Sequence, residues 1–187
     1  MNRSIVCDDS ALADIHNAGL LCAMLDVPRH QLVVPYPFKY LGLLGLTDKD
    51  WDLLQDRGLE ILDLSPEELA NAHRFKIGYP KLSANDCFSV AAAKARDNSL
   101  VISENPQLRL AAGQTGLCAC GLLWVIDELQ AAKACSIQRL IAALRGWRND
   151  GKMPHSDRSL KHRVRRLRRF TQAPSGKRTE VTHAWRQ

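Results

Sequence analysis

The segment Ile5-Val6-Cys7-Asp8-Asp9-Ser10-Ala11-Leu12 joins a short apolar run to the start of a helical pattern. A strand that leads directly into a helix is typical of the βα units that build a parallel sheet. Ligands of such sheets gather at the carboxyl ends of the strands and at the nearby helix starts. Asp8, which follows the strand directly, is therefore a candidate site residue.

Similar apolar runs alternate with helical patterns along most of the chain. We expect strands at residues 5–7, 31–34, 59–62, 100–102 and, less regularly, 117–119. We expect helices at residues 10–25, 47–55, 65–76, 83–96, 122–134, 136–147 and 156–170. This alternation predicts a three-layer α/β/α fold with a central parallel sheet, followed by C-terminal helices. The expected organisation is a domain at 1–155, a basic helix at 156–170 and a disordered tail at 171–187.

A second acid, Asp86, stands in the first turn of the helix that begins after Leu82-Ser83. Two carboxylates brought together at one edge of a sheet are suited to holding a divalent cation. Each acid also has a purely structural interpretation. Asp8 is a favourable helix N-cap, and Ser83 with Asp86 fits a variant of the capping box.

The fourth expected strand, Leu100-Val101-Ile102, is followed by Ser103-Glu104-Asn105, where a third acid would complete a metal site. Asn105 offers a carbonyl oxygen without charge. Glu104 has the charge but is displaced by one residue, and successive side chains of a strand point to opposite faces. Glu104 is equally well explained as a solvated charge.

The composition is ordinary for a globular protein: 187 residues, 45% hydrophobic and 25% charged. No apolar run of about 18 residues is present, so no membrane span is expected. The N-terminus does not read as a signal peptide, and a cytoplasmic location is expected. The six cysteines form no C-x-x-C pair, which favours reduced thiols that mostly act as small core residues. The phosphate-binding and nucleophile-elbow glycine motifs do not occur.

Positive charge is concentrated at the C-terminus. The formal net charge is +6, but residues 145–187 hold 13 Lys and Arg against 3 acids, and residues 1–144 hold 13 against 17. The candidates for nucleic-acid contact in the expected basic helix are Lys161, Arg163, Arg165, Arg166 and Arg169. Phosphate-backbone contact, docking of an acidic partner and a plain solvated face all remain open.

Four segments occur in an order that matches a known family. They are the opening segment 5–12, Leu82-Ser83-Ala84-Asn85-Asp86-Cys87, the segment 100–109 with its Leu108-Arg109 end, and Gly121-Leu122-Leu123-Trp124-Val125-Ile126-Asp127-Glu128-Leu129. Together they resemble the PIN domain family of metal-dependent ribonucleases, in particular its bacterial toxin-like branch related to VapC toxins. The resemblance extends over about residues 4–155.

The resemblance implies an acidic site that this chain carries only in part. The family places a Glu after the second strand, where this chain has Tyr40, and an Asp after the fourth, where it has Asn105. By the resemblance, Asp8, Asp86 and Asn105 would bind Mg²⁺ or Mn²⁺. The same three residues and Glu104 would form the catalytic set.

The function that the resemblance implies is a metal-dependent endoribonuclease of the PIN toxin type, with activity lowered by the depleted acidic set. Its implied partners are RNA, a small antitoxin protein and a second copy of the chain in a homodimer. The alternative is a catalytically inactive PIN domain that binds RNA or protein. A small-molecule-binding α/β domain is a third class, which no motif of the sequence supports.

Overall fold

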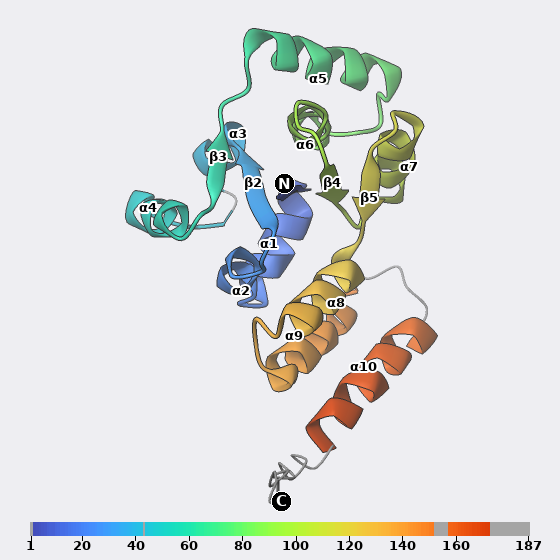
Figure 1. The fold of residues 1–187 in the computed structure, drawn as a ribbon. Helices are drawn as coiled ribbons and strands as arrows, with labels where there is room; N and C mark the ends of the chain where they lie inside the picture. The colour runs from blue at the N-terminus through green and yellow to red at the C-terminus, as the bar shows by residue number, and fades with distance from the viewer. Residues whose placement is uncertain (1, 43, 152–156, 173–187) are drawn as a thin grey trace, which may run out of the picture. The chain divides into compact units, whose positions relative to one another are not determined.

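The computed structural model describes residues 2–42, 44–151 and 157–172. The chain divides into two compact units, Met1–Pro154 and His155–Gln187. The first unit contains a sheet of five strands that are all parallel, in the order β3-β2-β1-β4-β5 (Figure 1). The strands are β1 (Arg3–Cys7), β2 (His30–Pro35), β3 (Glu60–Leu62), β4 (Ser99–Ile102) and β5 (Cys118–Cys120).

The described helices of the first unit alternate with these strands and then continue beyond the last one. They are α1 (Asp9–Asn17), α2 (Leu21–Leu25), α3 (Tyr36–Tyr40), α4 (Asp48–Asp56), α5 (Pro66–Gly78), α6 (Ala84–Lys94), α7 (Pro106–Gln114), α8 (Leu122–Ala132) and α9 (Ile137–Asn149). The second unit contributes α10 (Asp157–Gln172). The predicted parallel α/β fold with added C-terminal helices is confirmed.

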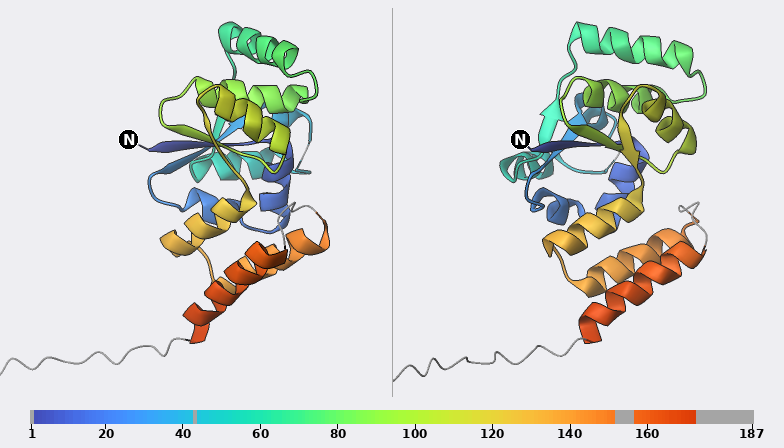
Figure 2. Two further views of the ribbon diagram at one scale, coloured as in Figure 1. Left: turned by 90° about the vertical axis from the view of Figure 1, so that its right-hand side faces the viewer. Right: turned by 45° about the vertical axis from the view of Figure 1, so that its right-hand side comes forward.

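Helices cover both faces of the sheet, as the alternation of side chains along each strand requires. Val6, Val33 and Val101 point to one face, where they pack in a core with buried residues of α6 and α7. Their neighbours Ile5 and Leu100 are also fully buried and point to the other face. Figure 2 shows the sheet with α6 and α7 on one side and α1, α2 and α8 on the other.

The N-termini of the helices follow the local chemistry of the sequence. Ser65 caps α5 in a capping box with Glu68, and Pro66 occupies the first helical position. Thr47 and Asp50 form the same arrangement at the start of α4. These caps satisfy amide groups that have no partner inside a helix, and they place the helix starts where the sequence predicts them.

Two expectations about the first unit are wrong. The helix expected at 10–25 is two helices, α1 and α2, because the chain turns at Gly19 with a φ of 67°, a conformation that favours glycine. The cysteines are not mostly core residues, since only Cys7 and Cys87 are buried. All six are free thiols, as expected.

The second unit confirms the helix expected at 156–170, which runs from Asp157 to Gln172. The tail was expected to begin at residue 171, but Thr171 and Gln172 still belong to this helix, and residues 173–187 lie outside the described residues. Among the helices that the structure describes, none has both the length and the apolar character needed to cross a membrane.

Candidate active site

Asp8 lies where β1 ends and α1 begins. Its Oδ1 accepts a hydrogen bond of 2.6 Å from the Ala11 amide, so the carboxyl is the N-cap of α1. The residue is only 2% exposed. The structural role considered for Asp8 is therefore real, and it occupies one carboxyl oxygen.

Asp86 lies in the first turn of α6, at the same edge of the sheet. Its Oδ2 accepts a hydrogen bond of 2.9 Å from the Ser83 amide, and its own amide donates to Ser83 Oγ at 3.0 Å. This is the predicted capping box. Asp86 is 7% exposed, so a second carboxylate is also buried here and fixed by its helix start.

The residues after β4 connect to these two acids. Asn105 Nδ2 donates to Asp86 Oδ2 at 3.5 Å, and Asn105 Oδ1 caps α7 by accepting from the Gln107 amide at 3.0 Å. The amide nitrogen of Asn105, and not its carbonyl oxygen, therefore faces Asp86. Asp8, Asp86 and Asn105 meet in one site, and Asn105 supplies it with a hydrogen-bond donor.

Ser103 is a site residue that the sequence did not single out. Its side chain is fully buried, its hydroxyl hydrogen-bonds to the Asp8 carboxyl, and its Oγ accepts from the Asn105 amide at 2.9 Å. A second contact joins the two helix starts, since Asn85 Nδ2 donates to Asp9 Oδ2 at 2.7 Å. Its place directly after β4, at the edge where Asp8 was expected, is the sequence feature that could have indicated Ser103.

The electrostatics of Asp8 set it apart. Burial is the main cause that raises the pKa of its carboxyl from 3.8 to about 7, and the negative charges of Asp86 and Asp9 act in the same direction. The hydrogen bonds from Ser103 and the Ala11 amide oppose this rise. Among the residues that the structure describes, no Lys or Arg acts on this pKa. The charged form of Asp8 is thus held in place but not neutralised.

Glu104 is engaged elsewhere. Its Oε1 accepts a hydrogen bond of 2.6 Å from the Leu122 amide at the start of α8, and its Oε2 lies 3.6 Å from Arg109 Nη1. The side chain is 12% exposed. Gly121 lies directly against it, because an added Cβ there would overlap the Glu104 carboxyl. Glu104 therefore supports the β4–β5–α8 corner, and is neither solvated nor directed at Asp8 and Asp86.

Tyr40 does not replace the missing acid. It ends α3 with 75% of its surface exposed, and its ring lies edge-on to that of Tyr36 with centroids 5.0 Å apart. Within the described residues, no three His, Cys, Asp or Glu side chains are grouped so that they could hold one metal ion. The acidic set of the site consists of Asp8 and Asp86, with Asp9 beside them.

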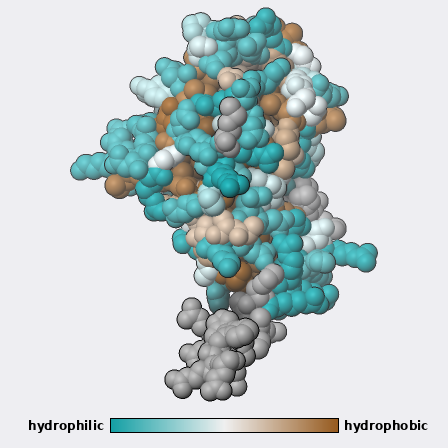
Figure 3. Space-filling view, in the orientation of Figure 1, coloured by the Kyte–Doolittle hydropathy of each residue, from teal (hydrophilic) through white to brown (hydrophobic). Residues whose placement is uncertain are grey.

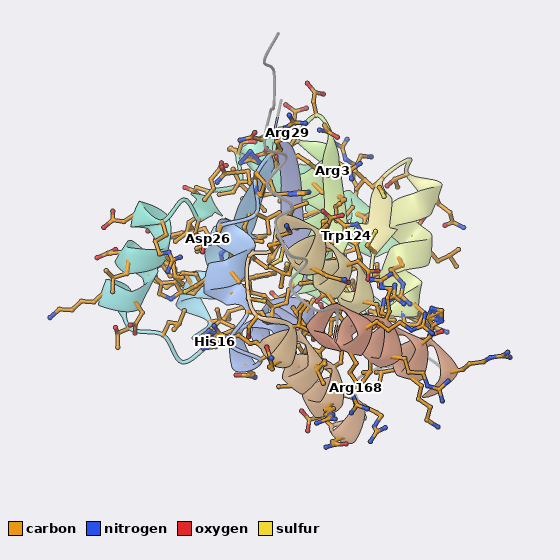
Figure 4. All side chains as sticks on the ribbon, turned by 60° about the horizontal axis from the view of Figure 1, so that its bottom comes forward. Arg3, His16, Asp26, Arg29, Trp124 and Arg168 are labelled. Atoms are coloured by element: carbon orange, nitrogen blue, oxygen red, sulfur yellow. The ribbon has the colours of Figure 1, made fainter. Side chains whose placement is uncertain are left out.

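The basic candidates all lie on α10, in the second unit. Figure 4 shows long nitrogen-tipped side chains along this helix, where Arg168 is labelled. Lys161, Arg165, Arg166 and Arg169 are exposed and Arg163 is half-buried. In the first unit, the same figure labels Trp124 of α8, whose ring lies edge-on to His30 at 5.7 Å between centroids. Trp124 is thus a packing residue and not a part of the acidic site.

No protein-family model matches the chain, and no curated protein matches it. The five-stranded parallel sheet in the order β3-β2-β1-β4-β5, with helices on both faces, is compatible with a PIN-like α/β fold.

Proposed function

We propose that the chain is a metal-dependent endoribonuclease of the PIN toxin type, with Asp8 and Asp86 at the centre of its active site. One observation carries the proposal. Asp8 is buried at the carboxyl edge of a parallel sheet beside a second buried acid, and its pKa is raised to about 7. A buried carboxylate without a basic partner costs stability, and such groups are concentrated at functional sites.

The donor set fits a hydrated Mg²⁺ or Mn²⁺. Mg²⁺ commonly takes one or two protein carboxylates and completes its shell with water and substrate phosphate. Asp8 and Asp86 would hold the ion, since each commits one identified carboxyl oxygen to a helix cap, Oδ1 in Asp8 and Oδ2 in Asp86. When bound, the ion polarises a phosphoryl oxygen and lowers the pKa of an attacking water.

The surrounding residues hold the two acids in position. The Ser103 hydroxyl and the Ala11 amide orient Asp8. The Ser83 amide and Asn105 Nδ2 orient Asp86. The site also lies at the N-termini of α1 and α6, where the partial positive charge of a helix favours an anionic phosphate.

A second candidate function is a PIN-like domain that binds RNA or protein without cleaving it. The observation that favours it is that no third carboxylate joins Asp8 and Asp86 where the resemblance implies one. Glu104 is bound at the start of α8, and Asn105 presents an amide nitrogen to Asp86. Two carboxylates hold a cation less tightly than a larger acidic set, because affinity rises with ligand charge.

The partners that belong to this proposal are RNA, which α10 would contact through its Arg side chains, a small antitoxin protein and a second copy of the chain. Contacts between basic side chains and phosphates supply affinity without sequence preference. The expected compartment is the cytoplasm, where the six free thiols would remain reduced.

Metal-dependent stabilisation and RNA cleavage separate these candidates. Thermal unfolding of the full chain would be followed while MnCl₂ or MgCl₂ is added, and cleavage of single-stranded RNA would be measured in parallel. A site-specific cation stabilises the folded state by about 2.7 kcal/mol at a concentration one hundred times its Kd. Asp86→Asn should abolish both effects, because the amide keeps the helix cap but removes the charge.

Asp52→Asn is the matched control, since Asp52 is an exposed acid on α4, and it should leave both effects unchanged. If the cation raises the unfolding temperature but the RNA is not cleaved, the binding module would be favoured over the nuclease. A melting curve that no cation shifts would contradict the proposed metal site.

A further inference from the structure

A pocket of 330 Å³ opens between the segment that joins α5 to α6 and the first turns of α7. Its lining includes Tyr79, Pro80, Lys81, Leu82, Gln107 and Leu110. The volume lies in the range of small-ligand pockets, about 300–1,000 Å³. In the space-filling view, apolar patches interrupt the hydrophilic surface at the end of the unit where α5, α6 and α7 lie (Figure 3).

The wall formed by this segment is held in place by three hydrogen bonds and one contact between aromatic rings. The Tyr79 hydroxyl donates to Gln114 Oε1 of α7 at 2.8 Å. Lys76 Nζ donates to the carbonyl of Pro80 at 2.8 Å and also to that of Leu82. Tyr79 further packs on Phe75, with ring centroids 4.6 Å apart. The pocket is therefore preformed, and a ligand would not have to order its walls.

The pocket adjoins the candidate active site on two sides. Leu82 precedes Ser83, whose amide binds Asp86 Oδ2 at 2.9 Å. On the opposite wall, the backbone amide of Gln107 donates a hydrogen bond to Asn105 Oδ1 at 3.0 Å. The helix starts that position Asp86 and Asn105 thus lie directly beside residues of the pocket lining. A ligand that reaches both would place its charged group at the acids and an adjacent group in the pocket.

The lining indicates the kind of group that fits. Leu82 is a buried floor residue, and Leu110 exposes 66% of its surface at the rim. Lys81 is an exposed cation, the Gln107 side chain is exposed, and none of the described lining residues is acidic. An apolar surface with an amide and an ammonium group at its edge matches a planar, hydrogen-bonding ring attached to a phosphate.

We propose that this pocket receives the nucleobase next to the phosphate that lies at Asp8 and Asp86. The proposal rests on the function proposed above. The faces of the base would contact Tyr79, Leu82 and Leu110. The side-chain amide of Gln107 would hydrogen-bond to the edge of the base, and Lys81 would contact the neighbouring phosphate. The site would therefore prefer a base at this position, and Gln107 would discriminate between bases.

The test compares labelled five-nucleotide RNAs of adenine, uracil or cytosine with an abasic ribose-phosphate chain of equal length. Binding is measured by fluorescence anisotropy on the full chain with CaCl₂ in place of MgCl₂ or MnCl₂ and with phosphorothioate-linked strands, so that a cation can join the acids to the phosphate while cleavage is suppressed. Stacking of a base on an aromatic side chain such as Tyr79 is worth roughly 1–3 kcal/mol, so RNA should bind the wild-type protein on the order of tenfold more tightly than the abasic chain.

Leu110→Ser should remove most of that difference, and Gln107→Ala should make the affinities for the three bases more nearly equal. Ile77→Ser is the matched control, because Ile77 is 68% exposed on α5 and does not belong to the pocket lining. It should leave all affinities unchanged. Since both apolar side chains are mostly exposed, circular dichroism should show folded proteins.

Equal affinity for RNA and the abasic chain, or an unaffected Leu110→Ser variant, would overturn the base pocket while leaving the metal site and RNA cleavage standing. If the wild-type protein is not stabilised by any metal and binds no RNA, the nuclease proposal and the pocket would be overturned together. The metal titration therefore distinguishes the two failures.

Discussion

Asp8 and Glu104 follow the ends of two neighbouring strands, but their surroundings differ: the charge of Glu104 is compensated by nearby donors, and the charge of Asp8 is not. Glu104 accepts a hydrogen bond from the Leu122 backbone amide and forms an ion pair with Arg109. Asp8 receives two hydrogen bonds, yet it faces the negative charges of Asp86 and Asp9. A compensated acid holds the structure together, whereas an uncompensated one is a candidate for binding a ligand. The environment of an acid thus indicates its role better than its position does.

Gly121 makes the contrast sharper. An added Cβ at this position would overlap the Glu104 carboxyl, so the absence of a side chain is what lets Glu104 approach the start of α8. Arg109, which pairs with Glu104, also donates to the Ser103 carbonyl at 2.7 Å. The Glu104 corner therefore supports the segment that carries Ser103 and Asn105, and through them it acts on the Asp8 site.

The largest expected effect concerns the pH dependence of Asp8. Because its pKa in the folded state is raised to about 7, the folded protein binds a proton that the unfolded chain has released. Wild-type stability should then fall relative to Asp8→Asn by at most about 3 kcal/mol between about pH 5 and pH 8. Asn keeps an acceptor for the Ala11 amide and has no charge to titrate.

Chemical denaturation of both proteins across this pH range, without divalent cations, measures the difference directly. Added Mn²⁺ should reduce it, because a bound cation favours the ionised carboxylate. Parallel stability curves for the two proteins would show that Asp8 is not an uncompensated charge in solution.

The next effect tests whether Glu104 is a compensated structural acid. Glu104→Ala should lower the free energy of unfolding by about 2–3 kcal/mol, because it leaves the Leu122 amide and Arg109 without their acceptor. Glu104→Gln should cost less, since its carbonyl can still accept from the Leu122 amide. If Glu104→Ala kept full stability but lost cation binding, Glu104 would be a metal ligand and the contrast with Asp8 would be wrong.

The sequence predicted much of the fold because its strands are short apolar runs bounded by turns. The five expected strands each overlap an observed one. The split between α1 and α2 was missed, although Gly19 was present to indicate it. The pairing of Glu104 was not predictable, because its partners Leu122 and Arg109 come from helices whose placement depends on tertiary packing. Asp8 and Asp86 were found because both are fixed locally, at helix starts.

A smaller effect is expected from restoring the third acid. Asn105→Asp can still cap α7 through a carboxyl oxygen, and it adds a negative charge beside Asp86. Mn²⁺ affinity, measured by calorimetry, should rise on the order of tenfold, because affinity grows with the charge of the ligands. Tyr40→Glu should add to this gain. Asn17→Asp is the control, since Asn17 is exposed at the end of α1.

Without metal, Asn105→Asp should destabilise the protein at pH 8, because a further negative charge raises the cost of ionising Asp8. That loss and the gain in metal affinity have the same origin, so they should appear together. A double variant, Asn105→Asp with Tyr40→Glu, that binds Mn²⁺ no better than wild type would show that these positions do not belong to the cation site.

The smallest expected effect concerns α10, where positive charge is exposed to solvent and screened by salt. If about four phosphates of single-stranded RNA are neutralised there, the logarithm of the binding constant should fall against the logarithm of salt concentration with a slope of about −3. Replacing Arg163, Arg165, Arg166 and Arg169 with Gln should flatten this slope and weaken binding, without adding repulsion.

The control replaces four basic residues of the first unit with Gln: Lys49, Arg74, Lys94 and Lys133. Equal slopes for the two quadruple variants would mean that α10 makes no special contact with RNA, and an acidic protein would then be the partner to test on that helix.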